Sequence, residues 1–505
     1  MTYDLLIVGG GINGCAIARE AALHGASVLL VERDDLASHT SSASTKLIHG
    51  GLRYLEHYEF RLVAEGLRER ERLLHAAPHL IRPLTFVLPH DHGLRPWWMV
   101  RLGLWLYDRL GGKSSLPASR GLSASDAAYA APLKGGAKGF VYADAFVDDA
   151  RLTLLNAMDA AVNGAEIATR TALEAAHRAG DHWLVGLSDG RRVETRMLVN
   201  AAGPWVHLLL DRLGIATRST VRLVKGSHIV VPRLYEGDHA YILQQPDRRI
   251  VFAIPYEGMT EVGTTDVPVE RPEDAGIDAG EVAYLCDAIN RHFTRRIAPA
   301  DVVATWSGVR PLYDDGTSAA QAVTRDYVLE LDADGPPLLS VFGGKITTAR
   351  QLAEDAMAKL GIGAGPVTRN RPFPGGNPCP GEGRGPAGGR FETGPRPSPG
   401  KRFEEYLAIV RARWPFLGDE RSIRMARAYG TMLEEMLAGI TEEAGLGADL
   451  GGGITETEAR WMRAREWAVT ADDALDRRSK VGLHLTPEQR AAFTRWWEAD
   501  KRREP

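Results

Sequence analysis

The first thirty residues alternate between apolar runs and a glycine-rich break. Residues 4–8 are apolar, residues 9–14 are rich in glycine, residues 12–24 are rich in alanine at helical spacing, and residues 27–32 are apolar again. This order predicts a strand, a tight turn, a helix and a second strand.

Two later apolar runs have the same character. Residues 197–201 end just before Gly203, and residues 338–342 end at a glycine pair that leads into helical spacing as far as Leu360. Short apolar strands that feed turns at one edge are typical of a parallel sheet covered by helices. We therefore expect these runs to lie in the same sheet as the first two strands.

A different pattern fills the middle of the chain. Residues 227–232, 241–244, 249–255 and 261–266 alternate or run as β-branched stretches bounded by Pro, Gly and Asp. They predict a second, mainly antiparallel sheet inserted into the first domain. Residues 373–400 are too rich in Pro and Gly to support a core and predict a linker, after which helical periodicity returns.

One predicted helix carries apolar residues around almost its whole circumference. Residues 94–110 read LRPWWMVRLGLWLYDRL, with Arg95, Arg101 and Arg109 among the aromatic residues. Such a helix suits either a membrane interface or a buried position. Of the two, we favour burial. Further along, Asp148 and Asp149 are expected to cap a helix that begins near Arg151.

Composition limits the classes of partner. Lys and Arg total 61 against 65 Asp and Glu, a formal net charge of −4, so no global field favours nucleic acid. Cys15, Cys286 and Cys379 are scattered without metal-binding spacing, which predicts a reducing, cytoplasmic setting and no metal site. The chain opens without the features of a secretory signal, and no apolar run of about 18 residues predicts a membrane span.

The glycine-rich turn has the spacing of a dinucleotide site. Gly9, Gly11 and Gly14 form a G-x-G-x-x-G pattern between a predicted strand and helix, where small residues let a pyrophosphate approach the helix N-terminus. Glu32 ends the second strand, where a carboxylate accepts hydrogen bonds from ribose hydroxyls and repels a 2′-phosphate. NADP is therefore disfavoured, while FAD and NAD both stay open.

The next segment favours FAD. Residues 40–56 read TSSASTKLIHGGLRYLE, which lacks the length and periodicity of the crossover helix that an NAD domain would have there. Its hydroxyl groups, Lys46 and the pair Gly50-Gly51 suit contacts along an extended phosphate and ribityl chain.

Six blocks then carry a resemblance to a known family. In collinear order between Tyr3 and Leu360 they are GGGING, TSSASTKLIHGGLRYLEHYEFRLV, VKGSHIVVP, VGTTD, SGVRPL and LLSVFGGKITT. Together they resemble the aerobic, membrane-associated, FAD-dependent glycerol-3-phosphate dehydrogenases. The resemblance implies FAD as cofactor, glycerol 3-phosphate as substrate and a quinone as electron acceptor. It also implies a peripheral position on the inner face of the cytoplasmic membrane. A homodimer is among the assemblies open to such a chain.

The expected fold is of the α/β class: a Rossmann-like FAD-binding domain, an inserted mainly antiparallel β-sheet substrate domain and a C-terminal helical domain. The expected boundaries are 1–80, 141–215 and 306–372 for the FAD-binding domain, 81–140 for a helical insertion on the substrate side, 216–305 for the substrate domain, 373–400 for the linker and 401–505 for the helical domain.

The motifs and the resemblance together predict a set of cofactor-binding residues. They are Gly9, Gly11, Ile12, Asn13, Gly14, Glu32, Arg33, Thr40, Ser41, Ser44, Lys46, Leu47, His49, Gly51, Leu52, Ala202, Gly203, Gly344, Lys345, Ile346 and Thr347.

A phosphate dianion requires fixed cations, and the planar fork of arginine fits it best. The substrate-binding candidates are Arg53, Tyr54, Thr264, Arg310, Arg325 and Lys345. Alcohol oxidation also releases a proton, for which histidine is the usual acceptor. His228 matches the substrate-site histidine of the family, and we predict that His228, Arg310 and Lys345 form the catalytic set.

Two other functions stay open from the sequence. A soluble oxidase of the same flavin fold would pass electrons to oxygen and act on glycerol 3-phosphate, an amine or an amino acid. A noncatalytic flavin-binding sensor would not require the cationic residues expected beside the flavin.

Overall fold

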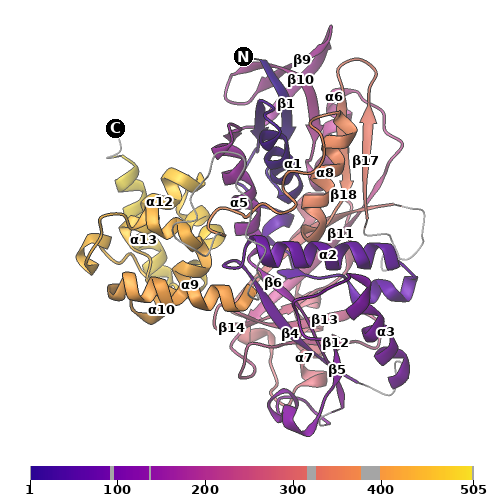
Figure 1. Ribbon diagram of the computed structural model, residues 1–505, viewed down its shortest axis with the longest axis vertical. Coiled ribbons are helices and arrows are strands. Elements are labelled where there is room, and N and C mark those ends of the chain that lie inside the picture. Colours follow the sequence, from indigo (N-terminus) through magenta and orange to yellow (C-terminus); the bar gives the residue numbers. More distant parts are fainter. Residues whose placement is uncertain (1, 91–95, 136–137, 315–325, 377–398, 503–505) are drawn as a thin grey trace.

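The computed structural model describes residues 2–90, 96–135, 138–314, 326–376 and 399–502. Two sheets and a separate group of C-terminal helices make up this part of the chain (Figure 1). The helices of the first 376 residues are α1 (Ile12–Leu23), α2 (Phe60–Ala76), α3 (Trp97–Leu110), α4 (Ala127–Ala130), α5 (Asp149–Val162), α6 (Val206–Leu213), α7 (Ala279–His292) and α8 (Ala349–Leu360).

The first sheet contains the predicted parallel strands. Its order is β17 (Tyr327–Asp332), β18 (Leu338–Gly343), β10 (Arg192–Asn200), β1 (Thr2–Val8), β2 (Val28–Val31) and β7 (Glu166–Ala168), with β8 (Leu173–Ala179) and β9 (His182–Leu187) attached beside β10. The pairs that join β18, β10, β1, β2 and β7 are parallel. The prediction of a Rossmann-like sheet is confirmed.

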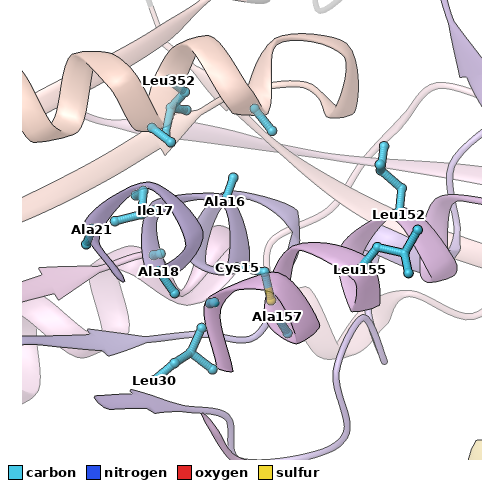
Figure 2. Packing of buried hydrophobic residues seen from close by; sticks show 14 of the residues in the cluster. Cys15, Ala16, Ile17, Ala18, Ala21, Leu30, Leu152, Leu155, Ala157 and Leu352 are labelled. Atoms are coloured by element: carbon cyan, nitrogen blue, oxygen red, sulfur yellow. The ribbon is translucent and has the colours of Figure 1, made fainter. Parts of the chain in front are cut away.

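Helix α1 packs between α5 and α8 on one face of this sheet (Figure 2). Its contact face is formed by small residues, including Ala16, Ala18 and Ala21, which let the neighbouring helices approach closely. Asp148 accepts a hydrogen bond from the backbone N–H of Arg151 at 3.0 Å, which confirms the predicted cap of α5. This packing holds the N-terminus of α1 at the end of β1.

The second sheet is larger than predicted. Its order is β15 (Val267–Pro268), β11 (Val221–Val231), β14 (Met259–Gly263), β13 (Ile250–Tyr256), β12 (Ala240–Gln244), β4 (Ile81–Pro89), β6 (Gly139–Val147) and β3 (Leu47–Ile48); β16 (Ala304–Tyr313) also pairs with β11, and β5 (Arg120–Gly121) pairs with β6. The pairs are antiparallel except β12 with β4.

The second sheet includes strands from outside the range expected for the substrate domain. β16 pairs with β11 from Val221 opposite Tyr313 to Val230 opposite Ala304, so residues 306–313 belong to the second sheet and not to the FAD-binding domain. β4 and β6 bring residues 81–89 and 139–147 into the same sheet, outside the expected range of 216–305. The predicted strand at 261–266 ends at Gly263. Local patterns cannot reveal such pairings, because the partner strands lie far apart in sequence.

The prediction that the helix at residues 94–110 is buried is also wrong for the described part of it, residues 96–110. Helix α3 buries Leu104 and Tyr107. In contrast, Trp98, Leu102 and Trp105 are 64%, 55% and 44% exposed. Apolar residues around the whole helix did not show which side would be buried. The position of α3 at the edge of the second sheet decides which side faces solvent (Figure 1).

The C-terminal domain is helical, as predicted. It contains α9 (Pro399–Arg413), α10 (Gly418–Tyr429), α11 (Leu433–Met436), α12 (Glu456–Glu466) and α13 (Pro487–Lys501), which share a core of their own beside α5 (Figure 1). Among the described residues, no helix combines the length and apolar character needed to cross a bilayer.

The predicted linker of 373–400 lies mostly outside the described residues, but both of its ends need correction. Phe373 is buried in the core of the first domain, where the guanidinium of Arg19 lies 3.9 Å from its ring centroid. At the other end, α9 already begins at Pro399. Burial of this aromatic ring shows that Phe373 belongs to the folded domain and not to a linker.

Candidate active site

A large cavity lies between the two sheets. Its wall includes Val8 and Glu32 at the carboxyl ends of β1 and β2, and Phe252 and Arg310 from β13 and β16. Open α/β sheets bind ligands at this edge, where strand ends and helix N-termini converge.

The glycine turn is shaped so that backbone can approach a ligand. Gly9 has a φ of +116°, and a Cβ atom there would lie 2.5 Å from the carbonyl oxygen of Ala201. A Cβ on Gly14 would lie 1.9 Å from the carbonyl oxygen of Gly9. Gly14 itself does not line the cavity, contrary to its prediction as a contact residue, because its missing side chain permits the tight turn instead. Both positions therefore require glycine.

Polar atoms around this turn fit a dinucleotide. Buried Glu32 accepts hydrogen bonds from the backbone N–H groups of Gly10 (2.6 Å) and Asp34 (2.9 Å). Burial raises the pKa of Glu32, and these two hydrogen bonds oppose that rise. Asn13 lines the cavity, and its buried Oδ1 has no hydrogen-bond partner among the described residues. Such an orphaned acceptor fits a ligand that supplies a donor.

The hydroxyl-rich segment borders the same cavity, but several of its hydroxyls bond to protein. Ser41 Oγ accepts from the N–H of Ile12 at 2.9 Å, and Thr40 Oγ1 donates to the carbonyl of Val309 at 2.7 Å. Ser44 Oγ donates to Asp149 at 2.7 Å. These bonds fix the segment against α1, β16 and α5.

Two predicted cofactor contacts in this segment lie elsewhere. Lys46 is buried behind the cavity wall, with Nζ 3.2 Å from Asp149 Oδ1, and Leu52 does not line the cavity. A buried ammonium requires a carboxylate partner, which explains why Lys46 turns inward. Apart from Gly14, the other predicted cofactor residues line the cavity.

Most of the predicted substrate residues come together on the wall of the same cavity. Arg310 donates from Nη1 to Asp266 Oδ1 (2.5 Å) and from Nη2 to Thr264 Oγ1 (2.9 Å). Lys345 Nζ lies 4.1 Å from the ring centroid of Tyr54. Arg53 lines the cavity as well, whereas Arg325 lies outside the described residues.

Sequence reasoning missed several residues of this wall. Among them are His57, Ile250, Phe252, Asp266 and Asp326. Asp266 ends the VGTTD block, so the block itself held a signal, but its pairing with Arg310 required the fold.

His228 does not line the cavity. It is buried on β11, where Nε2 lies 3.0 Å from Thr45 Oγ1, and Thr45 is part of the cavity wall. Burial lowers the pKa of His228 well below its usual range, and the charges of Lys46 and Arg310 add to this effect. The predicted base is therefore one side chain removed from the cavity.

Comparisons with known proteins agree with this geometry. Residues 4–350 match the family model described as FAD dependent oxidoreductase. The glycerol-3-phosphate dehydrogenase of Pseudomonas aeruginosa is 48% identical, over 100% of this chain and 96% of that relative. The chain belongs to the FAD-dependent glycerol-3-phosphate dehydrogenase family. FAD is its cofactor, and the glycine turn, Glu32 and Asn13 are suited to hold it.

Other members of this family and related folds are also similar. The aerobic glycerol-3-phosphate dehydrogenase of Escherichia coli is 45% identical, over 98% of this chain and 97% of that relative. The D-erythritol 1-phosphate dehydrogenase of Brucella abortus is 46% identical, over 98% of each. Among solved structures, the FAD complex of the Bacillus halodurans glycerol-3-phosphate dehydrogenase has a TM-score of 0.71 at 25% identity and covers 99% of this chain and 94% of that one.

Proposed function

We propose that this flavoprotein oxidises sn-glycerol 3-phosphate to dihydroxyacetone phosphate and passes the electrons to a quinone at a membrane surface. The observation that carries the proposal is Arg310, whose guanidinium lies on the wall of the same cavity as the dinucleotide turn. Arg53 and Lys345 add positive charge to this wall. A phosphorylated alcohol is the substrate class that such a group of cations suits.

The guanidinium of Arg310 is preorganised to bind phosphate. Asp266 and Thr264 hold its fork in one orientation, which lowers the conformational entropy lost when a ligand binds. Lys345, beside the ring of Tyr54, is suited to orient the hydroxyl groups. Bound FAD supplies the acceptor for the hydride from the substrate carbon.

The proposal of membrane contact rests on helix α3. Trp98, Leu102 and Trp105 expose apolar surface, and Arg101 and Arg109 lie on the same helix. Exposed Tyr58 and Phe60 lie at the start of α2, which packs against α3. Aromatic and basic residues together suit an interfacial helix, and we propose contact with the inner face of the cytoplasmic membrane.

Anaerobic titration of the oxidised flavin tests the substrate. Glycerol 3-phosphate should bleach the flavin absorbance at a ratio of one molecule per flavin, whereas glycerol should act only weakly. The identity with the Brucella relative makes D-erythritol 1-phosphate the second candidate, so it is titrated in parallel. Preferential bleaching by that compound would replace the proposed substrate, and no bleaching by either would contradict the dehydrogenase function.

The acceptor is tested separately. Turnover with a soluble quinone under argon should exceed turnover in air without quinone. Stoichiometric hydrogen peroxide formation and no response to quinone would identify an oxidase instead.

A further inference from the structure

The ring of His228 is held between two strands. On β11 it lies opposite Gly263 of β14 and Trp306 of β16. The indole of Trp306 stacks on the imidazole with 5.6 Å between ring centroids, and a Cβ on Gly263 would lie 2.0 Å from His228 Cδ2. The glycine therefore provides the space for the ring, and the two neighbours fix its plane.

A second titratable group shares this face of the sheet. Glu261 precedes Gly263 by two residues on β14, so both residues face His228. Its side chain is fully buried, and Oε1 lies 3.7 Å from His228 Nε2. Neither carboxylate oxygen has a hydrogen-bond partner among the described residues. Burying a carboxylate without donors is costly, which points to a role other than stability.

Charged residues from several neighbouring elements surround His228 and Glu261. Lys46 and Asp149, which bond to each other, act on Glu261 from the segment before β3 and from α5. Lys46 and Arg310 act on His228. The charges of Lys46 and Asp149 offset each other. The carboxylate of Glu261 is therefore the group that can balance the positive charge of a proton added to His228.

We propose that Thr45 and His228 form a proton relay that takes the hydroxyl proton of the substrate out of the cavity, with Glu261 as the counter-ion of the protonated ring. Thr45 lines the cavity and its Oγ1 lies 3.0 Å from His228 Nε2, so this residue can connect a substrate hydroxyl to the buried ring. The relay rests on the proposed dehydrogenase function.

The step balances as follows. The C–H bond of the substrate breaks and its electron pair leaves with the hydrogen as hydride, which the flavin chemistry of the family accepts. The O–H proton moves to Thr45 Oγ1 while the hydroxyl proton of Thr45 moves to His228 Nε2, and the C=O bond forms. Thr45 ends neutral, and Glu261 acts as the counter-ion of the new imidazolium. Glu261 is thus a positioning residue, because it acts through His228.

The protonation state of Glu261 sets the expected pH dependence. Burial raises its pKa to about 8; the charge of Lys46 opposes the rise and that of Asp149 adds to it. Below that pH the carboxyl group holds a proton and cannot neutralise an imidazolium. Turnover should therefore rise as the pH increases through about 8.

The main test is Glu261→Gln, which keeps the shape and removes the charge. We expect kcat to fall at least ~10-fold and the rise near pH 8 to disappear, while FAD content and KM for glycerol 3-phosphate stay unchanged. Stability gives a readout independent of turnover. Because the pKa of Glu261 is raised in the folded state, the folded protein binds more protons at this group, and the contribution of Glu261 to stability is lost as the pH rises from about 4.5 to about 8. The variant should therefore have a higher Tm than the wild type at pH 8 and above.

The matched control is Glu281→Gln. Glu281 is also buried, but it contacts the opposite face of β11, where it accepts hydrogen bonds from Ser227 Oγ (2.8 Å) and Thr265 Oγ1 (2.6 Å) and pairs with Lys225. This variant should lose stability and keep the wild-type pH profile. Thr45→Val and Thr45→Ser test the first link, since only serine retains the hydroxyl and should rescue turnover.

The outcomes separate the relay from the function. Wild-type enzyme that is not reduced by glycerol 3-phosphate would refute the proposed function. Reduction in the wild type, with an unchanged kcat and pH profile in Glu261→Gln, would refute the relay alone. If Glu261→Gln fails to fold, Thr45→Val provides the test. Full turnover in that variant would also refute the relay alone.

Discussion

Arg478 and Asp35 form a two-pronged ion pair that joins the C-terminal domain to the loop after Glu32. Arg478 donates from Nη1 to Oδ2 (2.6 Å) and from Nη2 to Oδ1 (2.8 Å), and Arg477 Nε also donates to Oδ2 at 2.6 Å. The loop that continues from Asp35 lines the cavity through Ala37, Ser38 and His39. The C-terminal domain therefore fixes one wall of the cofactor cavity.

Replacing Arg478 by Ala should weaken FAD binding as well as the fold. Asp35 then keeps only Arg477 as a partner, so the loss of stability should stay below the ~3–5 kcal/mol that is typical when a buried charge is left without any counter-ion. Thermal unfolding and the rate of flavin release measure the two effects. Arg424→Ala is the control, because it breaks the Arg424–Glu458 pair inside the C-terminal domain. Equal flavin release in both variants would show that general destabilisation, and not the Asp35 contact, is responsible.

Gly14→Ala should empty the cofactor site. The added methyl group would lie 1.9 Å from the carbonyl oxygen of Gly9, so the turn must open. The purified variant should contain little FAD by absorbance. Gly186→Ala is the control, because its Cβ would lie no closer than 4.0 Å to the carbonyl of Ala175. A fully yellow Gly14→Ala protein would mean that the turn does not hold the cofactor.

Substitutions of Arg310 should damage phosphate recognition in a graded way. Lysine keeps the charge but loses the fork, and alanine loses both, so kcat/KM for glycerol 3-phosphate should fall more in Arg310→Ala, by at least ~10-fold. Activity on glycerol should change little, and FAD should stay bound. Arg222→Ala removes an arginine of neighbouring β11 that pairs with Asp314 and should leave kcat/KM unchanged. Equal proportional losses for both substrates would exclude a phosphate contact.

Polar substitutions on α3 should weaken membrane binding. Trp98→Gln with Leu102→Gln removes exposed apolar surface, and each ~1.4 kcal/mol of lost transfer energy weakens partition into anionic vesicles about tenfold. Anaerobic flavin reduction by substrate should be unchanged. Val162→Gln, at an exposed position on α5, serves as the control. Unaltered vesicle binding in the α3 variant would place the membrane contact elsewhere.

His79 should limit stability in acid. Burial, with the nearby charges of Arg151 and Arg427, lowers its pKa to about 3, and neither ring nitrogen has a hydrogen-bond partner among the described residues. Between about pH 6.5 and pH 3 the unfolded chain binds a proton that the folded chain does not, so stability falls as the pH decreases. His79→Leu should flatten that decline in Tm, whereas His177→Leu, at an exposed position, should not. A decline of the same slope in both variants would show that other groups cause it.

The sequence alone determined the parts of this protein that depend on neighbours along the chain. The turn at Gly9 and Gly14 and the cap at Asp148 follow from local steric and hydrogen-bonding requirements, and the apolar runs of the parallel sheet could be recognised as strands from their composition. The six collinear blocks likewise indicated the family, because each block is a continuous stretch of residues.

Only the tertiary structure decided what depends on distant strands. The pairing of β11 with β16 enlarged the second sheet and brought Arg310 to its position opposite Val224. The inward turn of Lys46, the separation of His228 from the cavity and the exposed face of α3 followed from packing that no local pattern encodes. The physical reason is that burial and charge pairing are properties of a residue's surroundings in space, and most of those surroundings come from elsewhere in the chain.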